Sequence, residues 1–284
     1  MKKLETLFDE VTSTLTYIVY DDASKQAIVI DPVWDLDVAA GVLSETHHEK
    51  VKQFLASKNL NPILVMETHA HADHLSGAIL MKRDYPEIKV AIGEFITKVQ
   101  EVFAPVFNFK EFNTSGSQFD ILLKEGELFE MGVFKVQVFH TPGHTPACSS
   151  YLIEDHLFTG DALFMPDSGT GRCDFPKGSA KDLYHSIQKL YQLPDETKVH
   201  PGHDYQPGGR ELKFEANLGE HKKNNIQITA ATTEAEYIEF RQTRDKTLNA
   251  PKLLYPSIQV NITAGRLPAQ EDNQVSYLKI PLKL

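Results

Sequence analysis

Short apolar runs separated by turn residues predict a β-rich core in the first two thirds of the chain. The first two runs are joined by Asp21-Asp22-Ala23-Ser24 and predict a hairpin. The third follows Asn61-Pro62 and predicts a buried strand, because it is short, apolar and β-prone. The runs are Leu15–Tyr20, Ala27–Ile30, Ile63–Met66, Val133–Phe139 and Leu157–Phe158.

Helical spacing alternates with these runs. Val51, Phe54 and Leu55 predict a helix through Ser57, with His47 and His48 on its solvated start and not as metal ligands. Leu75, Ala78 and Ile79 also show helical spacing, which places Asp73 and His74 at a helix start, with Gly77 allowing a close backbone approach. A third helix opens at Ser179–Asp182 with an inner face of Leu183, Ile187 and Leu190, and we interpret its His185 as a packing or ligand-orienting group.

The sequence pattern changes beyond Tyr205, where prolines become frequent. Thr233–Glu236 resembles a capping box and predicts a helix, whereas Pro251, Pro256 and Pro268 predict short extended pieces. We therefore expect a catalytic unit over residues 1–208. Residues 209–284 are expected to form an extension packed on the same domain, where they help to wall the substrate cleft.

Composition is that of a soluble globular enzyme. The chain has 284 residues, 41% of them hydrophobic and 24% charged. A net charge of −10 and a pI near 5.6 argue against nucleic-acid binding, which needs a basic surface. No run of about 18 apolar residues predicts a membrane span. Acidic residues interrupt any signal-peptide core, so we expect a cytoplasmic protein; the acidic residues are Glu5, Asp9 and Glu10.

His69-Ala70-His71-Ala72-Asp73-His74 is the most informative stretch of the sequence. It places four metal-ligand side chains directly after the strand predicted at Ile63–Met66. Residues two apart in extended backbone point the same way, so His69 and His71 can converge on one ion. A single histidine would be unremarkable, and an aspartate alone could simply cap a helix. Three histidines and an aspartate at this spacing predict a metal site.

Three later segments complete the candidate ligand set. His144 follows a strand and a Pro-Gly turn, Asp161 follows the strand at Leu157–Phe158, and His203 follows a second Pro-Gly turn. Each motif alone is weak, because Pro-Gly-His is mainly a turn. Together, in this order, they predict a site built at one edge of a sheet sandwich.

The sequence resembles the metallo-β-lactamase superfamily from about Leu15 to Tyr205. This resemblance implies an α/β fold, an αββα sandwich with the metal site at one edge of the two sheets. The residues that carry it are His69, His71, Asp73, His74, His144, Asp161 and His203.

Within that superfamily, the chain looks most like the persulfide dioxygenases related to the ethylmalonic-encephalopathy protein. The segments that carry this closer resemblance are Gly171–Phe175, Leu183–Ile187, His203–Tyr205 and Pro256–Asn261.

The candidate ligands allow two metal chemistries, and their spacing does not choose between them. All seven could hold two Zn(II) ions per chain with Asp161 as a bridge, which would generate hydroxide for a hydrolase. His69, His144 and Asp161 could instead hold one Fe(II), because two histidines and one carboxylate leave positions open for O2 and substrate. The resemblance implies the iron site. The other four candidates would then orient the ligands and tune the iron, or belong to a second metal; they are His71, Asp73, His74 and His203.

The resemblance further implies oxidation of glutathione persulfide by O2 and water to sulfite and glutathione. Besides Asp73, the catalytic candidates are Arg172 and Tyr205: Arg172 as an anion anchor or as an ion pair with Asp174, and Tyr205 as a hydrogen-bond donor to bound sulfur or oxygen. The alternatives are a dinuclear zinc hydrolase of glutathione thioesters similar to glyoxalase II, a hydrolase of another small ester, lactam or lactone, and a binding protein that kept the fold. We expect a small-molecule substrate, no nucleic-acid partner and no membrane, and a homodimer stays open.

The two cysteines are too few for a disulfide framework, and we expect them not to be bonded to each other. Cys148 lies in an apolar run and is expected to be a buried, inert thiol. Cys173 adjoins Arg172, a cation that would lower the pKa of a neighbouring thiol.

Overall fold

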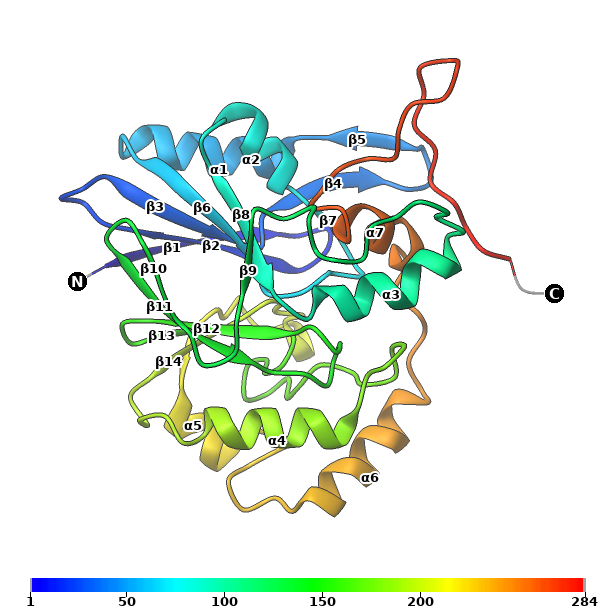
Figure 1. Ribbon diagram of the computed structural model, residues 1–284. Helices are drawn as coiled ribbons and strands as arrows, with labels where there is room; N and C mark the ends of the chain where they lie inside the picture. Colours follow the sequence, from blue (N-terminus) through cyan, green and yellow to red (C-terminus); the bar gives the residue numbers. More distant parts are fainter. Residues whose placement is uncertain (1, 283–284) are drawn as a thin grey trace.

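Two six-stranded sheets pack face to face in the computed structural model, which describes residues 2–282 (Figure 1). In the first sheet the order is β1-β2-β3-β6-β8-β9; its first three strands are antiparallel and the remaining pairs are parallel. These strands are β1 Lys3–Asp9, β2 Thr14–Tyr20, β3 Gln26–Ile30, β6 Asn61–Glu67, β8 Lys89–Gly93 and β9 Ile121–Leu123.

The second sheet runs β10 to β15 in chain order. Only its β13–β14 pair is parallel. Its strands are β10 Leu128–Met131, β11 Phe134–His140, β12 Ser149–Ile153, β13 His156–Gly160, β14 Lys198–Pro201 and β15 Ala216–Asn217. A small third sheet has the order β5-β4-β7, with β4 Val33–Asp37, β5 Val42–Ser44 and β7 Leu75–Ser76.

Strand β2 shows how one sequence serves two apolar layers. Every residue of β2 is buried. Leu15, Tyr17 and Val19 point into the core between the sheets, whereas Ile18 and Tyr20 point to the opposite side, towards the helices. Alternate side chains of a strand face opposite sides of its sheet, so a strand covered on both faces is apolar at most of its positions, as β2 is from Tyr17 to Tyr20.

Helices cover the outer face of each sheet and complete an αββα order of layers (Figure 1). Helices α1, α2, α3 and α7 pack on the first sheet, and α4, α5 and α6 pack on the second. The helices are α1 Thr46–Ser57, α2 Ala78–Asp84, α3 Ile96–Val106, α4 Ala180–Leu190, α5 Leu218–Asn224, α6 Glu234–Asp245 and α7 Leu254–Asn261, with a 3-10 turn at Pro207–Gly209. Within residues 2–282, none of these helices combines the length and the apolar character that a membrane span requires.

Several local predictions are confirmed. The hairpin forms from β2 and β3, Ser179 caps α4 by accepting from the backbone of Asp182, and Thr233 opens α6 with a capping box. Residues beyond 208 pack on both sides of the sandwich, since α6 lies against α4 and α7 lies against β7. The division of the chain at residue 208 stays a prediction.

The predicted solvated position of His47 and His48 is wrong, because both side chains are buried. His47 Nε2 lies 3.0 Å from Thr16 Oγ1, and His48 Nε2 lies 2.9 Å from Asp84 Oδ2. The first turn of α1 is therefore held by polar contacts under neighbouring elements.

The predicted helix start at Asp73 and His74 is also wrong. Leu75 and Ser76 form β7 and pair with β4, and α2 begins only at Ala78. Gly77 makes the close approach expected of it: its N–H donates to Pro32 O at 2.7 Å, and an added Cβ would lie 3.0 Å from Val33 O. The strand pairing between β7 and β4 therefore determines the conformation of Leu75 and Ser76, although the apolar spacing predicted a helix.

The tail predicted to be extended instead contains α7. Pro256 is the third residue of this helix, within the first turn, where a backbone N–H has no partner inside the helix. Proline is therefore tolerated at this position. The buried face of α7 includes Ile258, which joins the apolar cluster under the first sheet.

Candidate metal centre

Loops from both sheets bring the seven candidate ligands together at one edge of the sandwich. His69 to His74 follow β6, His144 follows β11, Asp161 follows β13 and His203 follows β14. Their ligand atoms form two groups, each with all atoms within 4.8 Å of one another. The groups are His69, His144 and Asp161, and His71, Asp73, His74 and His203.

The first group combines two imidazoles and one carboxylate. Asp161 Oδ2 lies 3.5 Å from His144 Nε2 and 4.0 Å from His69 Nε2. All three residues are buried. This donor set is the one predicted for a single Fe(II) ion.

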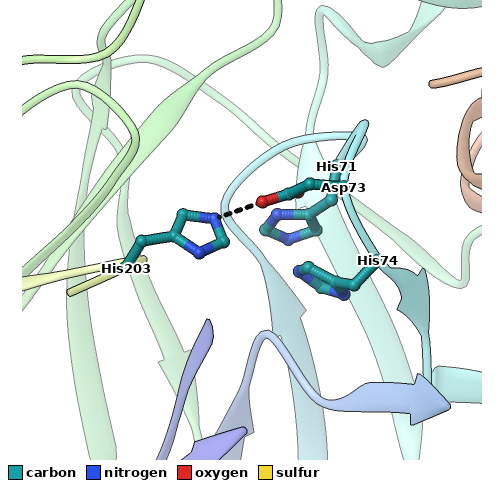
Figure 2. Close-up of side chains that lie close together, drawn as sticks. All are labelled: His71, Asp73, His74 and His203. Atoms are coloured by element: carbon teal, nitrogen blue, oxygen red, sulfur yellow. Dashed lines mark ion pairs between the residues drawn. The ribbon is translucent and has the colours of Figure 1, made fainter. Parts of the chain in front are cut away.

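The second group brings two sides of the molecule together. His203 enters from the second sheet and faces the loop that carries the other three residues (Figure 2). Its Nε2 lies 3.1 Å from Asp73 Oδ2 and 3.4 Å from Asp161 Oδ1. The two oxygens of Asp161 thus face different groups, and this carboxylate lies between them.

In four of the histidines the protein holds one ring nitrogen and leaves the other facing the site. Nδ1 of His69 contacts Thr68 Oγ1 at 3.0 Å, and Nδ1 of the other three contacts a backbone carbonyl oxygen. Those contacts are His74 to Leu75 at 3.2 Å, His144 to Arg172 at 2.8 Å and His203 to Ser13 at 3.2 Å. A contact at Nδ1 fixes the orientation of the ring and selects the tautomer in which Nε2 can bind a metal.

Buried nitrogen atoms without partners show that this cluster fits a metal. Among residues 2–282, Nε2 of His69, Nε2 of His74 and Nδ1 of His71 have no hydrogen-bond partner. A buried nitrogen left unpaired costs about 1–3 kcal/mol. A cation coordinated by these nitrogens would remove that cost.

Burial keeps most of these rings in the neutral form that binds metal. It lowers the pKa of His74 to about 3, places the pKa of His69 well below its usual value and also lowers that of His144. His203 differs: burial acts to lower its pKa, but the carboxylates of Asp73 and Asp161 together raise it. Three of the five imidazoles, those of His69, His74 and His144, are thus neutral donors next to concentrated negative charge.

Sequence reasoning missed two carboxylates beneath His71. Its Nε2 lies 3.1 Å from Asp31 Oδ1 and 3.4 Å from Glu67 Oε2, and both acids are buried. Burial opposes a charge on His71, yet these two carboxylates raise its pKa well above the usual value. The available signal was the placement of Asp31 and Glu67 directly after β3 and at the end of β6.

The C-terminal helices also contribute contacts that the sequence did not predict. Asn261 of α7 donates from Nδ2 to the carbonyl oxygens of His71 and His74, each at 2.8 Å. Asp245 of α6 accepts from the N–H of Cys173 at 2.8 Å and is paired with the buried Arg241. Two helices near the end of the chain therefore fix the loops that carry the ligands.

Arg172 is engaged in the ion pair that was one of its two predicted roles. Nε and Nη2 donate to Asp174 at 2.6 and 2.7 Å, and Nη1 donates to Asn249 O at 2.6 Å. Tyr205 stacks on His203 with a centroid distance of 5.4 Å and an angle of 12°. Tyr205 is therefore next to the second ligand group and remains exposed.

The structure corrects two other expectations. His185 neither packs in the core nor orients a ligand, because its side chain is 57% exposed and pairs with Glu234 at 2.9 Å. Cys173 does not gain acidity from Arg172, since burial raises the pKa of its thiol. Cys148 is the buried thiol that we expected, with its pKa raised by burial to about 12, and both cysteines are free.

One further group with ligand geometry lies elsewhere on the second sheet. It consists of His156, His200 and Glu215. His156 Nδ1 and His200 Nε2 are 2.9 Å apart and hydrogen-bond each other, which accounts for both nitrogens without an ion.

The chain belongs to the metallo-β-lactamase superfamily, whose sequence pattern matches residues 9–203. The αββα layers and the buried His/Asp clusters are those of this fold.

Among its relatives are two proteins of almost the same length. Glyoxylase B2 of Dictyostelium discoideum is 45% identical over 99% of this chain and 97% of its own length. A probable metallo-hydrolase of Burkholderia pseudomallei is 42% identical over 98% of both chains.

Persulfide dioxygenases are also similar. The human mitochondrial persulfide dioxygenase ETHE1 is 33% identical over 71% of this chain and 68% of its own length. The crystal structure of ETHE1 from Myxococcus xanthus superposes with a TM-score of 0.75 at 30% identity, covering 93% of this chain and all of that one. The protein is therefore a metalloenzyme of this fold.

Proposed function

We propose that the protein is a mononuclear Fe(II) persulfide dioxygenase that oxidises glutathione persulfide with O2 and water to sulfite and glutathione. The observation that carries the proposal is the group of His69, His144 and Asp161, two imidazoles and one carboxylate around one point. The likeness to ETHE1 in sequence and in structure supports it. We further propose that the reaction takes place in the cytoplasm.

The proposed reaction balances without a further reductant. One persulfide, one O2 and one water give one thiol, one sulfite and two protons. The two sulfur atoms together lose the four electrons that O2 gains: the terminal sulfur is oxidised to sulfite, the sulfur–sulfur bond breaks, and the inner sulfur is released as the thiol with one proton. A bound Fe(II) would supply open coordination positions and the redox chemistry that O2 requires.

The protein's own residues would position the reactants. Asp73 and His203 face each other at 3.1 Å beside Asp161, where their oxygen and nitrogen can orient a water molecule. The hydroxyl of Tyr205, on a ring stacked over His203, would donate to the bound sulfur or oxygen species. An anchoring role for Arg172 requires a substrate carboxylate to share the guanidinium with Asp174.

The second candidate is a dinuclear zinc hydrolase of glutathione thioesters. It is favoured by the second ligand group, by the position of Asp161 between the two groups, and by the likeness to glyoxylase B2 and to a probable metallo-hydrolase. Two zinc ions would generate hydroxide and polarise a thioester carbonyl.

Metal analysis and paired assays on one anaerobic preparation decide between these functions. The dioxygenase predicts one iron per chain, O2 consumption with glutathione persulfide, release of sulfite, and slow hydrolysis of S-lactoylglutathione. Two zinc ions per chain with rapid thioester loss and no O2 uptake would replace our proposal with the hydrolase. Arg172→Ala should raise the apparent KM for the persulfide more than it lowers the iron content, because its side chain does not belong to the ligand groups.

A further inference from the structure

A small apolar cavity of about 20 Å³ adjoins the loop that carries His69–His74 and the loop that carries His144. Its walls come from the first ligand loop, from α3 and α7, which lie close together in Figure 1, and from the segment after Cys173. The lining includes Ala70, Ala72, Val99, Phe103, Phe175 and Ile258.

The lining has almost no capacity for hydrogen bonding. Only Thr145 among the lining residues has a polar side chain. Its hydroxyl is already used, since Oγ1 lies 3.1 Å from Cys148 Sγ and accepts from the N–H of Ala147 at 3.2 Å. A buried water usually needs two to four polar partners, which these walls do not offer, so the cavity favours small apolar guests such as xenon.

The cavity shares backbone with the metal centre. Ala70 and Ala72 alternate with His69, His71 and Asp73 along the first loop, and Thr145 directly follows His144. The ring of Phe175 forms another wall and meets the ring of His144 edge-on, with centroids 5.0 Å apart. A guest in this cavity is therefore separated from the candidate ligands by little more than one loop.

Size decides which guest fits. The volume has room for a single small molecule, and an acyl chain or a glutathione moiety is far larger. Dioxygen is small and apolar, and unlike water it needs no polar partners in the cavity wall. We propose that this cavity is a binding site for dioxygen beside the metal centre, an inference that rests on the proposed dioxygenase function.

Xenon binding tests the cavity without requiring activity. Crystals of the full chain under xenon pressure should show one xenon atom between Val99 and Ile258, whether or not iron is loaded. Val99→Ile adds one methylene to the wall and should abolish this xenon site. Val99→Ala should enlarge the cavity and raise the xenon occupancy, which keeps the test informative if the larger side chain is not accommodated.

Steady-state kinetics test whether the molecule that occupies the cavity is dioxygen. In iron-loaded protein, Val99→Ile should raise the KM for O2 by about threefold or more while leaving the KM for glutathione persulfide and the iron content unchanged. Val102→Ile is the matched control, because Val102 lies on the same helix but does not line the cavity.

Three results would overturn the proposal. The first is an absence of xenon from the cavity of a protein that does consume O2, which leaves the dioxygenase function intact. The second is a KM effect of Val99→Ile on the persulfide and not on O2. The third is bound xenon in a protein that consumes no O2 with any persulfide, which removes the dioxygenase function together with the assignment of dioxygen.

Discussion

The side-chain amide of Asn261 donates to the backbone carbonyl of His71 at 2.8 Å, although the two residues are 190 positions apart in the sequence. The same amide nitrogen donates to His74 O, and Oδ1 accepts from the N–H of Ser76 at 2.7 Å. All of these groups are buried, so one side chain of α7 satisfies the backbone of the loop that carries the ligands.

Removal of this amide should loosen the metal centre as well as the fold. Asn261→Ala leaves two carbonyls and one N–H without their partner, and we expect a loss of about 2–4 kcal/mol in the free energy of unfolding. Urea denaturation measures this loss, and metal analysis after dialysis should show lower occupancy. Asn224→Ala, at an exposed position of α5, is the control and should change stability by less than about 0.5 kcal/mol. Equal stability and metal content in both variants would contradict the role of Asn261.

The Arg241–Asp245 pair should be far more important than a surface pair. Both residues are buried, and Asp245 also holds the N–H of Cys173. Arg241→Ala leaves a buried carboxylate without its cation, and we expect a loss of about 3–5 kcal/mol. Lys135→Ala, which breaks an exposed pair with Glu130, should cost less than about 1 kcal/mol. Similar unfolding midpoints for the two variants would be inconsistent with this difference.

These contacts also explain which parts of the site the sequence predicted. The ligand motifs are local: each follows a strand, either directly or after a Pro-Gly turn, so His69, Asp161 and His203 could be assigned from neighbouring residues. Asn261 and Asp245 act on the ligand loops through contacts with residues far away in the sequence, which no local pattern reveals.

The same distinction holds for the fold. The hairpin of β2 and β3 depends on alternation and a turn, both visible in the sequence. The burial of His47 depends on Thr16, which belongs to a different layer. The helix at α7 was missed because Pro256 was interpreted as a breaker, whereas its position in the first turn makes it compatible with a helix.

Replacement of Asp161 should remove metal without unfolding the protein. Its carboxylate faces both ligand groups, and an amide in its place gives the metal less negative charge. Asp161→Asn should therefore lose most of its iron, as measured by elemental analysis of protein prepared without oxygen. Asp155→Asn, at the other end of the same strand, is the control and should keep its iron. Full iron and full turnover in Asp161→Asn would exclude this residue as a ligand.

Acid should destabilise the protein through histidines outside the metal centre. Burial lowers the pKa of His221 to about 4, and among residues 2–282 neither of its ring nitrogens has a hydrogen-bond partner. Because the folded pKa lies below the unfolded value of about 6.5, the unfolded chain takes up the proton first as the pH falls. The stability that His221 contributes is therefore complete above pH 6.5 and is lost as the pH falls from about 6.5 towards 4.

His221→Leu should remove this part of the acid sensitivity. The free energy of unfolding, measured by urea titration at a series of pH values, should fall less steeply between about pH 6.5 and 4, with a gain of the order of 1–2 kcal/mol over wild type at pH 5. His185→Leu is the matched control, because the side chain of His185 is 57% exposed and pairs with Glu234 at the surface. If both variants kept the wild-type slope, burial of His221 would not be a source of the acid sensitivity.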